Sequence, residues 1–317
     1  MAYPFGLPLR LPEAAAGIRA LAARTMFGRH FGPYAAGRSL VRGLEELAVP
    51  VSYNPVTRSV GSIVVVAEGV EALRRAIQWK RTGRCSSLLA TTVGDFPADF
   101  GGIMLAPEID VCLMPSAWMA QSWCEDEPHV ARRLRIWPAG VDEAYWRPRR
   151  SQRRAGKRVL VYWKTEPDAF RREVESVLRQ FGWDPVTLRY GRYSQAEYRR
   201  RLSSAEFAVF ISRSETHGIA LAEAWASDVP TLAWDPGRLC YRGRDFSTVS
   251  SCPYLTDDTG RRWASLDDLR GILDEMPRRL GQFQPRNWVL ENMTDAVRAA
   301  HLLEIAASVG EQPARGK

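Results

Sequence analysis

Two glutamates eight positions apart are the first residues in this sequence whose type and spacing could do chemistry. They lie in the stretch SETHGIALAEAWASDVPTLAW (residues 214–234), where Glu215 precedes a glycine and Glu223 falls inside an apolar run. The pattern of a strand, a short loop with glycine and then a helix leaves the first N–H groups of that helix without intrahelical partners, at the positive end of its dipole. We therefore predict an anion site at three backbone amides. They belong to Gly218, Ile219 and Ala220.

The two carboxylates flank this expected anion site. Glu215 could accept hydrogen bonds from sugar hydroxyls in front of the helix, and Glu223 would lie roughly 8 Å further along it. That offset fits a ribose attached to the same diphosphate. A second explanation stays open, because a carboxylate near a helix N-terminus also stabilises the helix by about 0.3–1 kcal/mol without binding any ligand.

The segments around this stretch alternate between short apolar runs and helical patterns. Such alternation predicts parallel sheets covered by helices on both faces, and ligands of such sheets bind beyond the carboxyl ends of the strands. Ser194 is the expected N-cap of one helix. The expected strands are 62–69, 86–94, 110–116, 132–142, 158–163, 185–191, 206–212 and 229–234, and the expected helices are 70–81, 168–182, 194–205, about 217–227 and 287–310.

A basic stretch divides these segments into two sets. Residues 146–158, WRPRRSQRRAGKR, contain Pro, Gly, Ser and many arginines but little to bury, so we interpret them as an interdomain linker. The expected domains are 1–148 and 149–285, each Rossmann-like, with a C-terminal helical segment 286–317 packing back toward the first domain. A basic run could also bind nucleic acid, but aromatic residues are not interleaved in it beyond Trp146.

Composition is typical of a folded soluble protein and argues against disorder. The chain has 317 residues, 45% hydrophobic and 25% charged, and a formal net charge of +8 that favours an anionic partner. The five cysteines are widely spaced and are expected to be reduced and mostly buried. No apolar run reaches 18 residues and the N-terminus does not read as a signal peptide, so we expect a cytoplasmic protein.

Residues 214–234 resemble the E-x7-E signature of retaining GT-B glycosyltransferases, the group usually called family four. Upstream, the segments DVCLMPSAWMAQSW and IWPAGVDEAYWRP resemble those that close the N-terminal lobe in that family, and GPYAAGRSL (residues 32–40) resembles its Gly-rich loop near the donor phosphates. The resemblance spans roughly residues 30–235. It implies an α/β chain of the GT-B type, with two Rossmann-like domains facing each other across a cleft.

The resemblance also implies an activity and roles for single residues. A retaining, metal-independent hexosyltransferase would move a sugar from a UDP- or GDP-sugar to a glycan, lipid-linked or small-molecule acceptor, with no cofactor besides the donor. Glu215 would bind the transferred sugar and Glu223 the ribose. The remaining roles concern the diphosphate and the base. Lys164 would contact the leaving diphosphate, Gly218, Ile219 and Ala220 would bind phosphates by their amides, Tyr193 would begin the base-contacting loop, and Gly32 and Gly37 would lie near the donor phosphates.

Three departures from the family pattern keep other functions open. His217 replaces the usual aromatic residue before the glycine, where it could donate a hydrogen bond at the mouth of the site. An arginine partner for Lys164 is not evident, although Arg192 or Arg213 could substitute. The histidine that often ends a strand of the first lobe is replaced by Gly94, with Asp95 as the candidate for its polar contact.

The alternatives are an inactive nucleotide-sugar-binding protein and, less favoured, a nucleic-acid-binding or nucleic-acid-modifying protein. The basic excess would also suit peripheral association with the inner face of a membrane.

Overall fold

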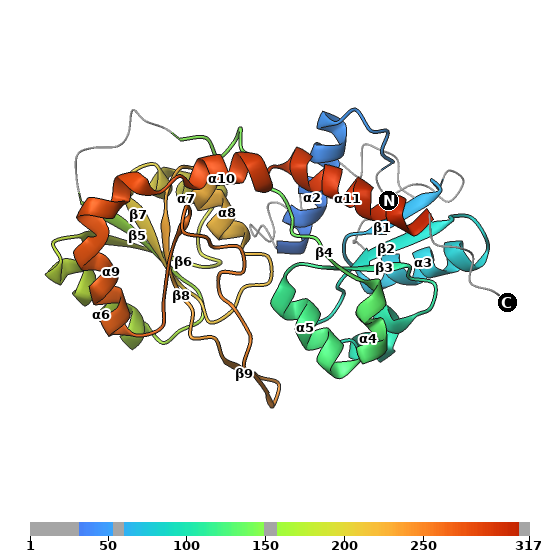
Figure 1. Ribbon diagram of the computed structural model, residues 1–317, viewed down its shortest axis with the longest axis horizontal. Coiled ribbons are helices and arrows are strands. Elements are labelled where there is room, and N and C mark those ends of the chain that lie inside the picture. Colours follow the sequence, from blue (N-terminus) through green and yellow to red (C-terminus); the bar gives the residue numbers. More distant parts are fainter. Residues whose placement is uncertain (1–31, 53–59, 149–156, 311–317) are drawn as a thin grey trace. The chain divides into compact units, whose positions relative to one another are not determined.

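The computed structural model describes residues 32–52, 60–148 and 157–310. The chain forms two compact units, the first made of Met1–Ala139 with Arg298–Lys317 and the second of Gly140–Val297. The first unit therefore ends at Ala139, before the boundary expected at residue 148, and the chain re-enters it at Arg298 rather than at residue 286. Each unit contains one parallel sheet with helices packed against it (Figure 1).

The first unit is built on a four-stranded parallel sheet in the order β1-β2-β3-β4. One face packs on α3 and α5 through residues such as Val64, Leu88 and Trp123, and the other on α2 and α11 through Val65, Leu89 and Leu302. Neighbouring strand residues thus enter opposite cores, as alternation along a strand requires. The elements are α2 (Gly32–Glu46), β1 (Ile63–Val66), α3 (Val70–Arg81), β2 (Ser87–Thr91), α4 (Asp99–Gly102), η1 (Ile103–Leu105), β3 (Val111–Met114), α5 (Ala117–Asp126), η2 (Pro128–Arg133), β4 (Leu134–Ile136) and α11 (Asp295–Gly310).

The second unit is built on a five-stranded parallel sheet in the order β11-β8-β7-β5-β6. Numbered along the unit this order is 2-1-3-4-5, a doubly wound arrangement in which the winding direction reverses between β5 and β7. A separate antiparallel hairpin, β9 and β10, lies between β8 and β11 in the sequence. The elements are β5 (Arg158–Trp163), α6 (Asp168–Gln180), β6 (Asp184–Arg189), α7 (Gln195–Leu202), β7 (Phe207–Ile211), α8 (Ile219–Ala226), β8 (Thr231–Trp234), β9 (Leu239–Tyr241), β10 (Arg244–Phe246), β11 (Gly260–Trp263), α9 (Leu266–Arg279), η4 (Leu280–Gln282) and α10 (Pro285–Asn292).

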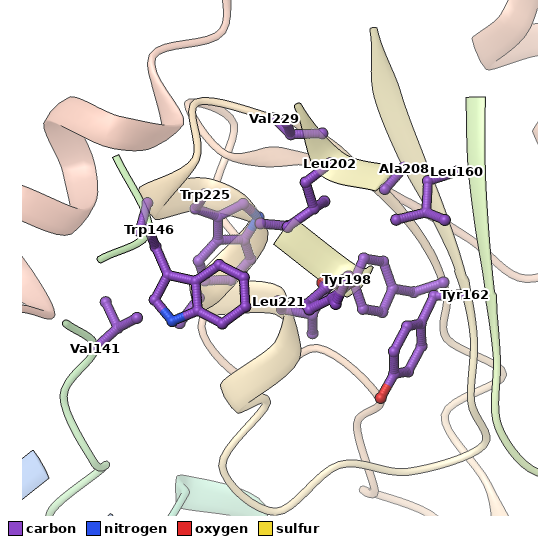
Figure 2. Close-up of a cluster of buried hydrophobic side chains, with 14 of the residues drawn as sticks. Val141, Trp146, Leu160, Tyr162, Tyr198, Leu202, Ala208, Leu221, Trp225 and Val229 are labelled. Atoms are coloured by element: carbon purple, nitrogen blue, oxygen red, sulfur yellow. The ribbon is translucent and has the colours of Figure 1, made fainter. Parts of the chain in front are cut away.

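Helices cover both faces of the second sheet. Val159 and Val161 of β5 face α6 and α9, whereas Leu160 and Tyr162 face a core shared with α7, α8 and α10. Figure 2 shows Tyr162 beside Tyr198 in this second core. Apart from Glu223, the α8 segment is apolar because it packs against both the sheet and α10, which explains its run of small residues.

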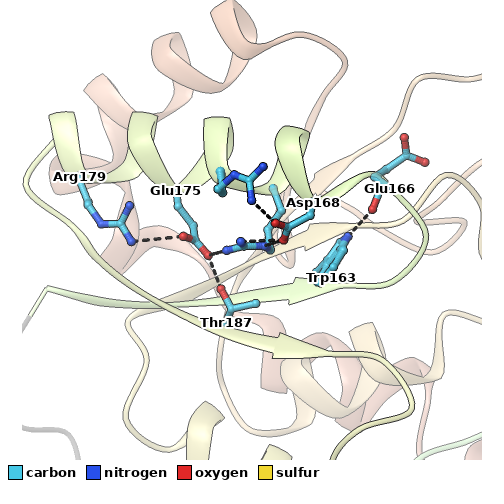
Figure 3. Close-up of polar contacts among 8 residues, drawn as sticks. Trp163, Glu166, Asp168, Glu175, Arg179 and Thr187 are labelled. Atoms are coloured by element: carbon cyan, nitrogen blue, oxygen red, sulfur yellow. Dashed lines mark hydrogen bonds and ion pairs between the residues drawn. The ribbon is translucent and has the colours of Figure 1, made fainter.

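On the face of the sheet that α6 and α9 cover, polar contacts hold helix α6 against strand β6. Figure 3 shows Arg179 and Thr187 meeting at the carboxylate of Glu175, with Arg179 Nη2 at 3.2 Å from Oε2. Burial alone raises the pKa of Glu175, but hydrogen bonds from Thr187 and Arg171 outweigh it and hold that pKa below its ordinary value. The carboxylate therefore stays charged and ties the helix to the strand.

Several expected elements are confirmed. The helix predicted at 70–81 is α3 and the strand predicted at 158–163 is β5, each with the expected bounds. The hydroxyl of Ser194 caps α7, accepting the N–H of Glu197 at 3.1 Å. Cys85, Cys112 and Cys252 are buried free thiols, as expected, whereas Cys240 is exposed.

Three expectations about local structure are wrong. Residues 32–40 belong to helix α2 and not to a Gly-rich loop. Trp146, placed in a linker, is only 3% exposed and packs edge-on against Tyr198; residues 149–156 of that stretch lie outside the described residues. The helix expected at 287–310 is two helices, α10 and α11, and the break lets Val141 donate its N–H to Met293 O at 2.9 Å.

Candidate functional site

The candidate site lies at the carboxyl edge of the second sheet, where the winding direction reverses. Lys164 follows β5 directly and Glu215 lies in the loop after β7, the two strands that flank the reversal. The backbone N–H of Lys164 donates to Ile211 O at 3.0 Å, which holds the end of β5 against the end of β7. Open α/β sheets bind their ligands at this topological position.

The two residues expected to act in catalysis contact each other. Lys164 Nζ lies 2.8 Å from Glu215 Oε1, with exposed side-chain fractions of 23% and 17%. Lys164 Nζ also lies 4.9 Å from the ring centroid of Tyr190, a cation–π contact. The backbone N–H of Glu215 donates to Ser250 O at 3.0 Å, so both ends of the pair are fixed by the sheet and its loops.

Helix α8 begins immediately beyond this pair. Gly218 is its N-cap residue with φ 67° and ψ 34°, a left-handed conformation that glycine adopts without steric cost. No side chain caps the helix, and within the described residues no backbone hydrogen bond is donated by Gly218, Ile219 or Ala220. These three N–H groups therefore form the set of free donors predicted from the sequence.

The opposite end of α8 is fixed firmly. Arg286 Nη1 donates to Ala226 O at 2.6 Å and to Glu143 O at 3.2 Å, placing a cation where the helix dipole is negative. Trp225 and Trp288 meet edge to face with ring centroids 5.4 Å apart. Helix α8 is thus anchored at its C-terminus, which fixes the direction of its N-terminal amides.

Glu223, on α8, and a group of tyrosines lie behind these amides. Tyr198 donates its hydroxyl hydrogen to Ala220 O at 2.6 Å, and the hydroxyls of Tyr162 and Tyr193 are 2.9 Å apart. Burial raises the pKa of all three tyrosines, and the charges of Glu215 or Glu223 raise them further. The hydroxyls therefore stay protonated and act as hydrogen-bonding groups, and that of Tyr198 holds the first turn of α8.

His217 is an uncharged residue at neutral pH. Burial lowers the pKa of its imidazole from the ordinary 6.5 to about 4. It cannot supply positive charge to an anion at neutral pH, but its neutral ring remains able to form a hydrogen bond.

A second ion pair at this edge was only partly foreseen. Arg213, which follows β7, forms two hydrogen bonds with Glu166, which follows β5, at 2.9 Å and 2.6 Å. The Glu166 side chain is 6% exposed and that of Arg213 is 41% exposed. Trp163 of β5 donates its indole N–H to Glu166 O at 2.6 Å (Figure 3). Glu166 could have been found from its place just after a predicted strand.

The remaining predicted site residues belong to the first unit. Gly32 is the first residue of α2, and Gly37 is buried within that helix. Asp95 is exposed in the loop after β2, and its N–H donates to Asp99 Oδ2 at 2.9 Å. A Cβ added at Gly94 would lie 2.7 Å from Asp99 Cβ, so Asp99 fills the space beside Gly94. Ligand contacts by these residues stay predictions.

Within the part of the chain that the structure describes, no group of three or more His, Cys, Asp or Glu side chains could hold a metal ion. Every helix of that part is too short or too polar to cross a bilayer.

No protein-family model matches the sequence, and no curated protein is significantly similar to it. Solved structures are similar in fold. AviGT4, a glycosyltransferase involved in avilamycin A biosynthesis, is 13% identical with a TM-score of 0.51 over 98% of both chains. Sucrose-phosphate synthase from Thermosynechococcus elongatus is 12% identical with a TM-score of 0.53, over 80% of this chain and 74% of that one. The lipopolysaccharide outer core galactosyltransferase WaaB is 12% identical with a TM-score of 0.50, over 86% and 80%.

The chain therefore has the α/β fold of GT-B glycosyltransferases. That its two domains face each other across a cleft stays a prediction, as do its activity and substrates at this level of identity.

Proposed function

We propose that this chain is a retaining glycosyltransferase that moves a hexose from a UDP- or GDP-sugar to a glycan, lipid-linked or small-molecule acceptor. The observation that supports it most is the 2.8 Å pair of Lys164 and Glu215 at the reversal of the second sheet, in front of the uncapped end of α8. A cation, a carboxylate and free amides at one edge suit a ligand that joins a diphosphate to a sugar.

The diphosphate would be bound by the amides of Gly218, Ile219 and Ala220 together with Lys164. Fixed dipoles and a lysine at this position stabilise the negative charge that develops on the leaving group, and they need no reorganisation during the reaction. Arg213 is a second cation at the same edge, held in place by Glu166.

The two glutamates would hold the two sugar rings of the donor. Glu215 orients Lys164 before the donor binds, and it accepts hydrogen bonds from hydroxyls of the transferred sugar once Lys164 turns to the phosphate. Glu223 accepts hydrogen bonds from the ribose, and Tyr193 contributes to the pocket wall at the base. Neutral His217 donates or accepts a hydrogen bond at the entrance.

The reaction then runs as a front-face displacement. The acceptor hydroxyl attacks the anomeric carbon from the side on which the diphosphate leaves, so the new glycosidic bond keeps the anomeric configuration. The bond between anomeric carbon and phosphate oxygen breaks, and that phosphate oxygen takes the proton of the acceptor. Positioning of the two reactants supplies much of the rate.

Metal ions have no role in this scheme, because Lys164 and the amides of α8 neutralise the leaving group. Transfer measured in EDTA should match transfer in added Mg²⁺ or Mn²⁺ within about twofold, whereas a metal-dependent site would lose several kcal/mol of charge stabilisation. A strict requirement for divalent metal would contradict this part of the scheme.

A second candidate function is a protein that binds nucleotide sugars without turning them over. The observation in its favour is Gly94, whose surroundings are filled by Asp99 and leave no room for the histidine of the family pattern. Slow hydrolysis of the donor separates the two functions. We expect hydrolysis by the wild type and none by Glu215→Gln, whereas a binding protein would bind the donor and hydrolyse it in neither form.

A further inference from the structure

The hairpin β9–β10 projects from the second unit and does not belong to its five-stranded sheet. Its strands pair only with each other, with Tyr241 opposite Arg244. The two turn residues Arg242 and Gly243 both have positive φ, 53° and 77°, which matches the type I′ turn of a two-residue hairpin loop. Figure 1 shows β9 reaching away from the sheet of its own unit. Two short strands alone contribute little to the stability of the fold. We therefore look for a role of the hairpin other than stabilising the fold.

The surface chemistry of this hairpin combines positive charge with aromatic and aliphatic side chains. Residues 238–246, RLCYRGRDF, contain three arginines and one aspartate. Tyr241, at the end of β9, is 43% exposed, and Arg238 and Arg242 are exposed on either side of it. Arg244 lies over the ring of Phe246 at 4.9 Å, which stiffens the second strand.

The base of the hairpin is connected to the candidate site. Asp235, just after β8, accepts hydrogen bonds from Ser250 Oγ and Ser251 N, both at 2.9 Å, and these close the loop that carries the hairpin. Ser250 O in turn accepts the N–H of Glu215 at 3.0 Å. The hairpin and the Glu215 loop are therefore held at the same edge of the second sheet.

We propose that the hairpin Leu239–Phe246 docks the protein on an anionic lipid surface. Arginines are attracted to the negative surface potential of such a leaflet, and tyrosine rings favour the level of the headgroups. Docking would bring the edge with Glu215 close to the headgroups, where a lipid-linked acceptor presents its hydroxyl. This step deepens the proposed function, because it selects the lipid-linked class among the acceptors.

A lipid surface suits the hairpin better than a nucleic acid does. Non-specific nucleic-acid binding uses a groove of cations along the backbone and successive aromatic platforms for the bases. The hairpin offers a single exposed aromatic ring, Tyr241, next to its turn, while Leu239 and Phe246 pair at its base. A narrow tip of this kind can enter a headgroup layer.

The test is binding of the full-length protein to vesicles, with charge-matched variants. The hairpin variant Arg238→Gln/Arg242→Asn removes two charges and keeps the turn, because asparagine tolerates positive φ. The control variant Arg75→Gln/Arg278→Gln removes two exposed arginines from helices α3 and α9. We expect wild type and control to bind vesicles of phosphatidylcholine with 40% phosphatidylglycerol, and the hairpin variant to bind about 30-fold more weakly.

Pure phosphatidylcholine vesicles should bind none of the three proteins well. Tyr241→Ser should weaken binding to the anionic vesicles without any change in net charge. Equal loss in hairpin and control variants, or no binding by the wild type, would overturn the docking role. Binding of single-stranded DNA that depends on the hairpin, without vesicle binding, would overturn it in favour of a nucleic acid.

Cys240 gives a direct spectroscopic readout, because it is the exposed thiol within the hairpin. In a Cys124→Ser background, an environment-sensitive fluorophore on Cys240 should shift to shorter emission wavelength on anionic vesicles and stay unshifted on neutral ones. An unshifted probe on bound protein would show that another surface makes the contact.

Failure of this proposal can be told apart from failure of the proposed function. The hairpin variant should retain binding and slow hydrolysis of a soluble nucleotide sugar. Glu215→Gln should lose hydrolysis and keep vesicle binding. Vesicle binding without any nucleotide-sugar binding would support the docking surface and contradict the donor site.

Discussion

At the scale of single residues, the contact between Lys164 and Glu215 gives the site its most specific feature. Each side chain is mostly buried. Lys164 directly follows β5 and Glu215 lies in the loop after β7, the two strands that flank the sheet reversal. Removal of one partner of such a pair leaves the other charge buried without a counter-charge, which destabilises the protein. In the proposed function, the donor supplies a new anion to the lysine and new hydroxyl donors to the glutamate.

We expect Glu215→Gln to lower kcat/KM for glycosyl transfer by about 100-fold or more, as removal of one preorganised electrostatic group does in other enzymes. Glu173→Gln, an exposed carboxylate of α6, is the matched control and should retain full activity. Both can be measured with radiolabelled donor once the donor class is known. Comparable activity of Glu215→Gln and Glu173→Gln would remove Glu215 from the mechanism.

His217 should make the free energy of unfolding depend on pH. Its folded pKa of about 4 lies below the ordinary 6.5, so the unfolded chain binds a proton first as the pH falls. Stability is therefore lost between about pH 6.5 and pH 4, by on the order of 3 kcal/mol, and is fully present above that window. Urea unfolding of wild type and His217→Gln at several pH values measures the effect.

The variant should show a flatter pH dependence than the wild type over that window, whatever its stability at pH 7. Parallel curves would mean that His217 is protonated as readily in the folded protein as in the unfolded chain.

At the scale of elements, helix α8 supplies the backbone amides of the proposed anion site. Its direction is set at the C-terminal end by Arg286 and Trp288, and its N-terminal end opens with Gly218 in a left-handed conformation. A residue with a Cβ at that position would strain the turn that aims the amides.

Gly218→Ala should lower stability by about 1–2 kcal/mol because alanine must adopt the left-handed region, and it should weaken donor binding as the first turn of α8 shifts. Gly271→Ala is the matched control. Gly271 lies in helix α9 with nothing within 4 Å of an added Cβ, so alanine should stabilise that helix by about 0.5–1 kcal/mol. Thermal and urea unfolding compare the two variants. Equal shifts of the same sign would contradict the role given to the Gly218 conformation.

At the scale of the whole molecule, the sequence predicts the sheets better than the connections between them. Continuous apolar runs such as RVLVYW identify β5 because both faces of the strand are covered. The break between α10 and α11 could not be read from the sequence, since it depends on the close approach of Gly140 to Thr294 and Asp295. Helix α9 could have been found from Ser265 and Asp268, which form a capping box ahead of an apolar repeat.

The sequence predicts those parts of the candidate site that follow from strand order and from the conformational freedom of glycine. Lys164 and Glu215 each follow an apolar strand, so their meeting at one edge follows from a parallel sheet. The pairing of Arg213 with Glu166 and the tyrosines behind α8 depend on packing in three dimensions, which spacing along the chain does not encode. The position of Asp99 next to Gly94 likewise depends on a loop conformation, which the periodicity of the sequence does not predict.

The central claim is that the N-terminal amides of α8, with Lys164 and Glu215, bind a nucleotide-diphosphate sugar. The most direct measurement is the melting temperature of the full-length protein with UDP, GDP and ADP compounds and their sugars. At 100 times its dissociation constant a donor should stabilise the fold by about 2.7 kcal/mol, a rise in melting temperature of about 4 °C.

We expect one nucleotide class to give this shift in the wild type and a much smaller one in Lys164→Met. A complete panel that leaves the melting temperature of the wild type unchanged would contradict the donor site.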